Sequence, residues 1–380
     1  MRTWILLPTA VFALACQPPV TLEPDSGNPV TDAGVDAGLQ CPDQQHERDG
    51  GCVTEIAWAA AATGPIARDH HGTFMRPGIG TDKTALIVFG GVDMALGEAR
   101  HDTWIAKPQD DGFITAWTAG PRSLFWQAGM GVDGQGSRLY SVSGISVDSM
   151  GHSALTPRVQ SVAINPDGSM GTWREEKALP GVGRFHITAT RVGDWLFAMG
   201  GRTDDGVAKK EIWRAHIGAD GVLSDWVEER AFPLPRTHHA SFAFGHRLYL
   251  AGGFDATNFT GQPTHHRDIL TATVDPATGA LSEWTTIALP WDLSTHSAGV
   301  MDGYVYLVGG FDGSLNLLNL VRRAKLNEDG TLGSWEELTP LIHARAHVHH
   351  TPMFGGRIYS VGGNVGDHFT TDEVMIGFVY

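Results

Sequence analysis

The sequence predicts an all-β protein, a β-propeller with six blades, from three observations. Its 48 glycines are spread among aromatic and aliphatic residues, which is typical of short strands and tight turns. Six apolar segments end in small residues, namely LIVFGG, LYSVSG, LFAMGG, LYLAGG, VYLVGG and IYSVGG, closing at Gly91, Gly144, Gly201, Gly253, Gly310 and Gly363. Six tryptophans keep step with them, 51 to 59 residues apart: Trp58, Trp117, Trp173, Trp226, Trp284 and Trp335. A repeat of this length indicates propeller blades.

The first residues predict export. Residues 1–15 carry one Arg and an apolar run of secretory-signal length, and they end in a small-residue context before Cys16. The letters ALAC resemble a bacterial lipobox, which implies cleavage before Cys16 and lipidation of that residue; an ordinary signal peptide cleaved nearby is the alternative. Gln17 follows the Cys, which by the rules for such lipoproteins favours the outer membrane. We therefore expect an outer-membrane-anchored lipoprotein that contacts the membrane through its lipid only.

Two short segments separate this signal from the repeats. Residues 16–40 are rich in Pro, Gly, Asp and Ala with little to bury, and they predict a flexible acidic tether. Cys41 and Cys52 bound the next segment, residues 41–52, and the exported context favours a disulfide between them over two free thiols. A metal site made of these two residues and His46 lacks a fourth ligand and the usual close Cys pairing.

Residues 53–380 form the predicted propeller, and each repeat contains four strands. An inner strand such as HASFAFG is followed by the Gly-Gly strand, a third strand and an outer strand that carries the Trp. Since successive strands alternate in direction, the loops between second and third strands share one rim with the connections between blades. The Gly-Gly strands are alike because they form the common core, whereas the loops that follow them are free to differ.

The two ends of the repeat region predict how the ring closes. After Trp335 the chain has room for three more strands, but it has no seventh Trp and no outer strand for blade six. The segment EIAWAAA, residues 55–61, precedes the first inner strand and has no blade of its own. We expect it to supply the missing outer strand, which would cover an otherwise unpaired edge.

At this level of detail the sequence resembles the kelch-repeat family. The resemblance covers residues 58–380 and rests on the Gly-Gly strand, the later Trp, and Arg and His before the next inner strand. Blade two departs from the pattern because Ser143 replaces the first Gly and no Arg-x-His precedes its inner strand. We expect that blade to be locally irregular.

The Arg and His residues at the blade entries are the candidate ligand-binding residues. Equivalent positions in a ring face one axis, and a converging Arg and His set suits an anion or a sugar carboxylate. In kelch propellers, however, repeated Arg and His commonly hydrogen-bond backbone between blades. Adjacent His on a strand point to opposite faces, which weakens a metal interpretation, and we assign no metal. The candidates are Arg68, His71, Arg184, His186, Arg236, His239, His296, Arg345 and His347.

Several chemistries find no support in the sequence. The net charge of −15 and the lack of a long Lys/Arg run argue against a nucleic-acid partner. The propeller has no Cys for the Tyr-Cys cross-link of a copper-radical oxidase. Its Asp-Gly segments lack the alternating oxygen ligands of a calcium loop, and no Gly-x-Ser-x-Gly segment is present. We therefore name no cofactor and no catalytic residue.

Three functions remain open. We favour a non-enzymatic propeller of the cell envelope that binds a protein or glycan at the cell surface through the rim of variable loops. The alternative is a sugar-active enzyme, similar to six-bladed kelch proteins that interconvert anomers of sialic acid, with Arg and His at the channel mouth. The third is a structural envelope component.

Overall fold

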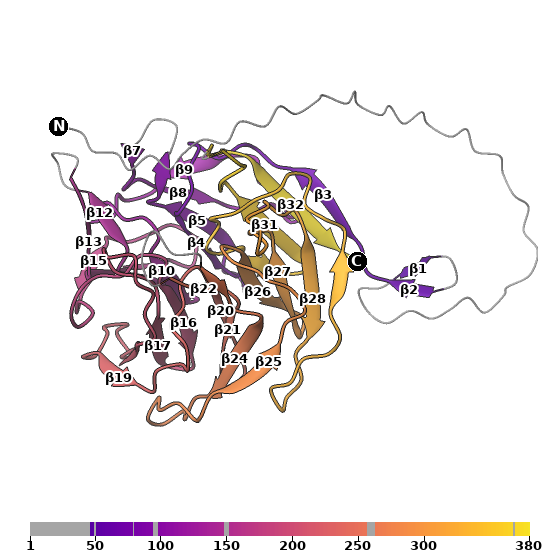
Figure 1. Cartoon of the computed structure of the whole chain (residues 1–380). Coiled ribbons are helices and arrows are strands. Elements are labelled where there is room, and N and C mark those ends of the chain that lie inside the picture. The colour runs from indigo at the N-terminus through magenta and orange to yellow at the C-terminus, as the bar shows by residue number, and fades with distance from the viewer. Residues whose placement is uncertain are drawn as a thin grey trace, which may run out of the picture. The chain divides into compact units, whose positions relative to one another are not determined.

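The computed structural model describes residues 46–48, 51–78, 80–93, 98–147, 152–256, 263–367 and 369–380. These residues form strands, turns and loops, and six sheets of four strands surround one axis (Figure 1). No helix among them has the length and apolar character that crossing a bilayer requires. The all-β architecture and the blade number are as predicted.

The first three blades follow the chain without interruption. Blade one contains β4 (Gly72–Arg76), β5 (Ala85–Phe89), β8 (Thr103–Ala106) and β9 (Trp117–Ala119). Blade two contains β10 (Gly131–Gln135), β11 (Arg138–Val142), β14 (Val159–Ala163) and β15 (Arg174–Glu176). Blade three contains β16 (Thr188–Val192), β17 (Trp195–Met199), β18 (Ile212–His216) and β19 (Val227–Glu229).

The remaining blades repeat this order until the chain ends. Blade four contains β20 (Ala240–Phe244), β21 (Arg247–Ala251), β24 (Asp268–Thr273) and β25 (Thr285–Ala288). Blade five contains β26 (Ser297–Met301), β27 (Tyr304–Val308), β28 (Val321–Lys325) and β29 (Glu336–Leu338). Blade six contains β30 (Met353–Phe354), β31 (Arg357–Val361) and β32 (Val374–Val379), and β3 (Ile56–Ala60) lies at its outer edge.

The register of blade six joins the two ends of the described propeller. β3 pairs antiparallel with β32, with Trp58 opposite Gly377. The indole nitrogen of Trp58 donates to the carbonyl of Thr339, which follows the outer strand of blade five, at 3.0 Å. Trp173, Trp226 and Trp284 make the same kind of bond to the carbonyls of Pro121, Lys177 and Arg230 in the preceding blades. The repeated Trp thus links adjacent blades.

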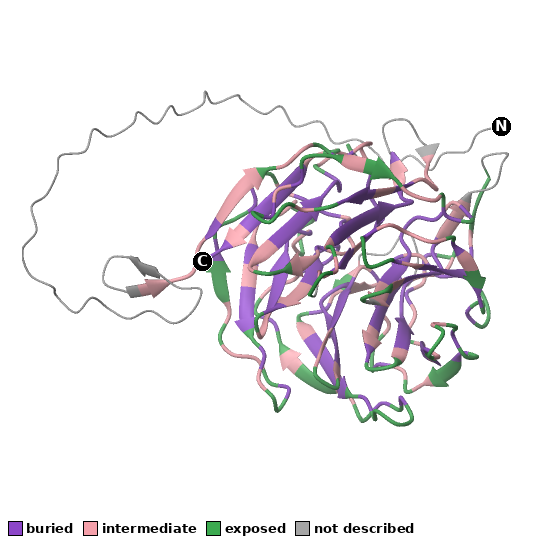
Figure 2. Cartoon of the chain, turned by 180° about the vertical axis from the view of Figure 1, so that it is seen from behind, coloured by how far each residue is buried: buried purple, intermediate pink, exposed green. Residues whose placement is uncertain are grey.

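The Gly-Gly strands form the core of each blade. β5 is buried along its whole length, and the four residues after the first are buried in β11, β17, β21, β27 and β31. Figure 2 shows these buried strands between exposed turns. A Cβ on Gly91 would lie 2.5 Å from the Asp69 carbonyl oxygen, and one on Gly310 would lie 2.5 Å from that of Ser294. Such contacts exclude any side chain, which explains the repeated glycine.

Blade two is regular despite its altered sequence. Its four strands pair in unbroken register from Gly131 opposite Val142 to Ser161 opposite Arg174. Ser143 takes the left-handed conformation of the missing glycine, with φ of 60°, and its hydroxyl donates to the Thr156 carbonyl at 2.8 Å. The expected irregularity is therefore confined to one residue, because a local hydrogen bond accompanies the unfavourable φ.

Short hairpins extend the second-to-third-strand loops on one rim. They are β6 (Val92–Asp93) with β7 (Glu98–Ala99), β12 (Ile145–Val147) with β13 (Ser153–Leu155), and β22 (Phe254–Asp255) with β23 (Thr264–His265). A separate hairpin joins β1 (His46–Arg48) to β2 (Gly51–Val53). The predicted signal, Cys16, the tether and Cys41 lie outside the described residues, so lipidation and the Cys41–Cys52 disulfide stay predictions.

Candidate functional site

All six blades begin with the same backbone geometry. In each blade a residue at the entry forms an isolated antiparallel bridge with the residue that follows the Gly-Gly pair. This bridge places the blade entries and the second-to-third-strand loops on the same rim, as the strand count predicts. The bridges are Asp69 with Val92, Ala128 with Ile145, Phe185 with Arg202, Thr237 with Phe254, Ser294 with Phe311 and Ala346 with Asn364.

The four entry arginines are buried inside their own blades. Arg68 donates to the Gly90 carbonyl at 2.9 Å and holds both carboxylate oxygens of Asp102, at 3.1 and 2.9 Å. Arg236 repeats this pattern with the Gly252 carbonyl at 3.1 Å and Asp268 at 2.9 and 3.3 Å. Their partners therefore tie the start of the third strand to the entry. The other two pairs are Arg184 with Glu211 and Arg345 with Glu373.

The two blades without an entry Arg change both members of the pair. In blade two, Gln127 donates to the Ser143 carbonyl at 2.7 Å, and Arg158 occupies the carboxylate position, since its carbonyl accepts from the Ser143 N–H. In blade five, Leu293 occupies the entry and is buried in an apolar cluster. Leu320 occupies the carboxylate position there, since its carbonyl accepts from Gly309 as that of Asp102 accepts from Gly90. These exchanges indicate that the residue at the entry position stabilises its own blade.

One residue after the bridge, every blade places a left-handed residue beside the axis. We call these six the axial residues: His70, Gly129, His186, His238, Thr295 and His347, with φ between 52° and 59°. Glycine adopts this conformation freely, and His does so more often than most side chains. Their backbones form hydrogen bonds around the axis: His70 N–H to His347, Gly129 to His70, His186 to Gly129, Thr295 to His238 and His347 to Thr295, at 2.8 to 3.2 Å.

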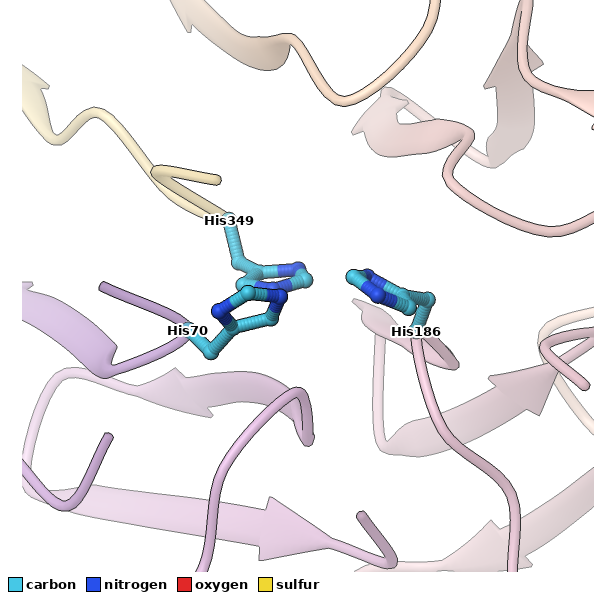
Figure 3. Close-up of side chains that lie close together, drawn as sticks. All are labelled: His70, His186 and His349. Carbon is cyan, nitrogen blue, oxygen red and sulfur yellow. The ribbon is translucent and has the colours of Figure 1, made fainter. Parts of the chain in front are cut away.

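The four axial histidines gather around the axis together with His349, two residues after His347. The rings of His186 and His238 stack with centroids 3.5 Å apart, and those of His70 and His347 stack at 4.2 Å. The ring of His349 lies 5.7 Å from that of His70 and 5.4 Å from that of His186. Figure 3 shows His70 and His349 together, facing His186 from another blade. We call these five residues the histidine cluster.

Burial favours the neutral form of three histidines of the cluster. Loss of water holds the pKa values of His186, His238 and His349 well below their ordinary range, and neighbouring histidines, with Arg202 beside His238, add to this lowering. A neutral imidazole carries a lone pair that can accept a proton or bind a metal ion. Nδ1 of His186 and Nε2 of His349 are buried without a hydrogen-bond partner.

A buried carboxylate and three aromatic rings surround the cluster. Oδ1 of Asp69 lies 2.7 Å from Nδ1 of His70. The ring of Phe254 stacks on His238 at 4.6 Å, and that of Phe185 contacts His186 at 3.9 Å. Phe311 lies 6.0 Å from His347. The result is a polar centre with apolar walls, which is the usual composition of a ligand site.

Three groups in this cluster could hold a metal ion. Each offers three ligand atoms that lie within 4.8 Å of one another: His70, His186 and His349; His186, His238 and His347; and Asp69, His70 and His347. Imidazole nitrogen suits zinc, copper, iron and nickel.

The candidate residues from the sequence divide into three sets. His186 and His347 lie in the histidine cluster. The four arginines lie in pairs within the blades. His71, His239 and His296 are buried between blades, where each ring tip lies close to the first glycine of the preceding blade's pair, at Gly362, Gly200 and Gly252. Adjacent histidines do face apart as expected: His70 and His238 face the axis, and His71 and His239 face a neighbouring blade.

Sequence reasoning missed His70, His238 and His349. A signal for the first two was present, because aligning the entries on the Arg puts His70, Gly129, His186, His238 and His347 in one column. A column that accepts Gly and His, rather than apolar residues, is typical of a left-handed position. For His349 no such signal exists, since its counterparts are Gly72, Gly131, Thr188, Ala240 and Ser297.

Exposed apolar side chains gather on the same rim. Of the eleven large exposed apolar residues among the described ones, seven lie in blade connections or second-to-third-strand loops. They are Leu124, Val182, Leu234, Leu315, Ile342, Val365 and Phe369. The blade entries, which carry the axial residues, lie on the same rim. We call this surface the entry rim.

Comparison with known proteins gives partial matches. No family model matches the chain. Kelch-like protein 33 of Homo sapiens is 28% identical over 163 residues, which is 42% of this chain and 28% of that protein. Kelch-like protein 36 of Mus musculus is 26% identical over 196 residues, 40% of this chain and 31% of that protein. The chain thus matches less than a third of either relative. The solved structure of YjhT superposes with a TM-score of 0.60 at 14% identity, covering 83% of this chain and 95% of that one.

Proposed function

Because the chain belongs to the kelch-repeat β-propeller family, we propose that it is a non-enzymatic binding protein whose entry rim holds a protein partner. The observation that carries this proposal is the uneven distribution of exposed apolar side chains, most of which lie on that rim. Clusters of exposed apolar residues rimmed by polar ones mark interaction surfaces.

Two features of the scaffold support a binding role. The entry arginines, the inter-blade Trp bonds and the axial backbone ring keep the loop bases in place, which lowers the ordering cost of binding. The loops themselves differ in length from blade to blade, and hairpins extend three of them. A stable base with variable loops suits recognition of one particular partner.

The test is an affinity purification from the native envelope fraction with matched variants. Val182→Ser combined with Leu234→Ser removes two apolar side chains from neighbouring blade connections of the entry rim. Val222→Ser, at the turn between the third and fourth strands of blade three, is the control on the other rim. We expect a partner that the wild type and the control retain, and that the double variant retains at least tenfold less. Equal retention by all three proteins would place the partner's binding site outside the entry rim. Retention of a glycan and no protein would contradict the proposal of a protein partner.

We also propose that the protein reaches its partner as an exported lipoprotein of the outer membrane. The support is the apolar run before Cys16 and the acidic tether of residues 16–40, whose length would give the propeller reach. Incorporation of labelled palmitate into the wild type, and its loss in Cys16→Ala, is the expected outcome. A processed protein without label would instead indicate an ordinary signal peptide.

The binding platform depends on a closed ring, and we infer that β3 closes it. The supporting contacts are the β3–β32 register and the bond from Trp58 to Thr339. Deletion of residues 55–61 should expose the edge of β32 and lower the melting temperature markedly. An unchanged melting curve would contradict closure by β3.

A further inference from the structure

We propose that the histidine cluster binds one first-row transition metal ion, with His70, His186 and His349 as its ligands. This site is separate from the apolar contacts of the entry rim, and it stands or fails independently of the proposed protein partner. The three residues come from blades one, three and six, so the site exists only when the ring is closed.

The first argument is the number and kind of donors at one place. Each of the three histidines offers a ring nitrogen, and the three nitrogens lie within 4.8 Å of one another. Tetrahedral zinc with bonds of about 2.0–2.1 Å to nitrogen needs its ligands roughly 3.4 Å apart. Small side-chain rotations would close that gap. Figure 3 shows the rings turned toward a common space.

The second argument is the unsatisfied state of the ring nitrogens. His186 is only 3% exposed, and its Nδ1 has no hydrogen-bond partner, nor has the buried Nε2 of His349. A buried polar atom without a partner costs about 1–3 kcal/mol, so histidines at the axis are unfavourable unless something fills the space between them. A metal ion would satisfy both nitrogens at once.

The third argument is the carboxylate behind His70. Asp69 is 1% exposed and lies 2.7 Å from Nδ1 of His70. A carboxylate in this place holds the proton on Nδ1, so that Nε2 carries the lone pair that can bind a metal ion. This is the usual arrangement behind a metal-binding histidine.

The test measures metal binding to the full chain after treatment with a chelator. Zn²⁺ is titrated by calorimetry, and Co²⁺ is added separately because its visible absorption reports nitrogen ligands. We expect one ion per chain, a melting temperature several degrees higher with saturating Zn²⁺, and Co²⁺ absorption that Zn²⁺ displaces.

Three variants assign the site. His349→Gln removes one ligand, and His186→Asn removes another while keeping a residue that tolerates the left-handed φ at this position. Each should weaken Zn²⁺ binding at least tenfold. His246→Gln, at an exposed turn between β20 and β21, is the matched control and should bind as the wild type does. Far-UV circular dichroism and melting without metal check that each variant is folded.

Two results would overturn the proposal. One is the absence of saturable binding of Zn²⁺, Co²⁺, Ni²⁺ and Cu²⁺ by the folded wild type, which would leave the cluster filled by water. The other is binding that His349→Gln and His186→Asn leave unchanged, which would place the ion at other histidines.

Discussion

The entry arginines and the axial histidines lie two residues apart in the chain, yet they differ in what their side chains meet. Each entry Arg meets a carboxylate, and a main-chain carbonyl of its own blade accepts from three of the four. Where the Arg is absent its partner changes with it, as in Leu293 and Leu320. The histidine cluster instead brings several ring nitrogens within 4.8 Å of one another at the axis. The arginines are therefore part of the scaffold, whereas the cluster gathers potential ligand atoms at one place.

The largest effect expected from this contrast is the loss of an entry pair. Arg236 is 1% exposed, and Arg236→Ala would leave Asp268 without its cation. Removal of one partner of a buried pair costs about 3–5 kcal/mol in the free energy of unfolding. Urea unfolding measures this loss. Arg267→Ala, which removes an exposed arginine 3.8 Å from Asp292, is the control and should change stability little.

Acid should destabilise the fold through histidines that lie between blades. Burial lowers the pKa of His71 to about 3, assisted by Arg68 and His70, and burial lowers that of His296 to about 3. In the unfolded chain a histidine binds its proton near pH 6.5. The stability that these buried neutral histidines allow is therefore fully present above pH 6.5 and is lost as the pH falls toward 3. At pH 5 each of the two histidines lowers the free energy of unfolding by about 2 kcal/mol.

Urea unfolding at pH 7.5 and pH 5.0 measures that cost. Methionine occupies the same position in blade two, as Met130, so His71→Met and His296→Met remove the titration with a residue the fold already accepts there. Each variant should reduce the difference in stability between the two pH values. A difference that both variants leave intact would assign the acid effect to carboxylates.

We expect that the Arg236–Asp268 pair can be replaced by the apolar pair that blade five has at the same positions. Arg236→Leu with Asp268→Leu copies Leu293 and Leu320, and an apolar pair of similar volume often equals a buried ion pair in stability. We expect the double variant to recover more than half of the loss seen in Arg236→Ala. A double variant less stable than Arg236→Ala would show that blade four cannot accommodate the apolar pair.

The smallest effect concerns the axial backbone. Thr295 is β-branched and has φ of 56°, a conformation that costs such residues about 1–2 kcal/mol. Thr295→Asn should raise the free energy of unfolding by about 0.5–1 kcal/mol, measured by thermal melting. A decrease would mean that the threonine side chain stabilises the axis by more than its strained backbone costs.

Much of the fold could be predicted because its causes are local. Apolar strands, Gly-Gly turns and a Trp at fixed intervals need only neighbours in sequence to be recognised. The histidine cluster was predicted in part: His186 and His347 were identified, but His71 and His239 were chosen where their neighbours His70 and His238 face the axis. The two histidines of each adjacent pair face apart, and the one that faces the axis is the left-handed one, His70 or His238.

The sequence by itself determined the repeat, the blade number and the order of strands, because period and turn chemistry are written along the chain. Only the tertiary structure decided which histidines meet. Segments more than a hundred residues apart return to one axis, and the distance between His70, His186 and His349 depends on the closure of the whole ring. The tertiary structure also decided that each entry arginine pairs within its own blade, because its carboxylate partner lies 27 to 34 residues further along the chain.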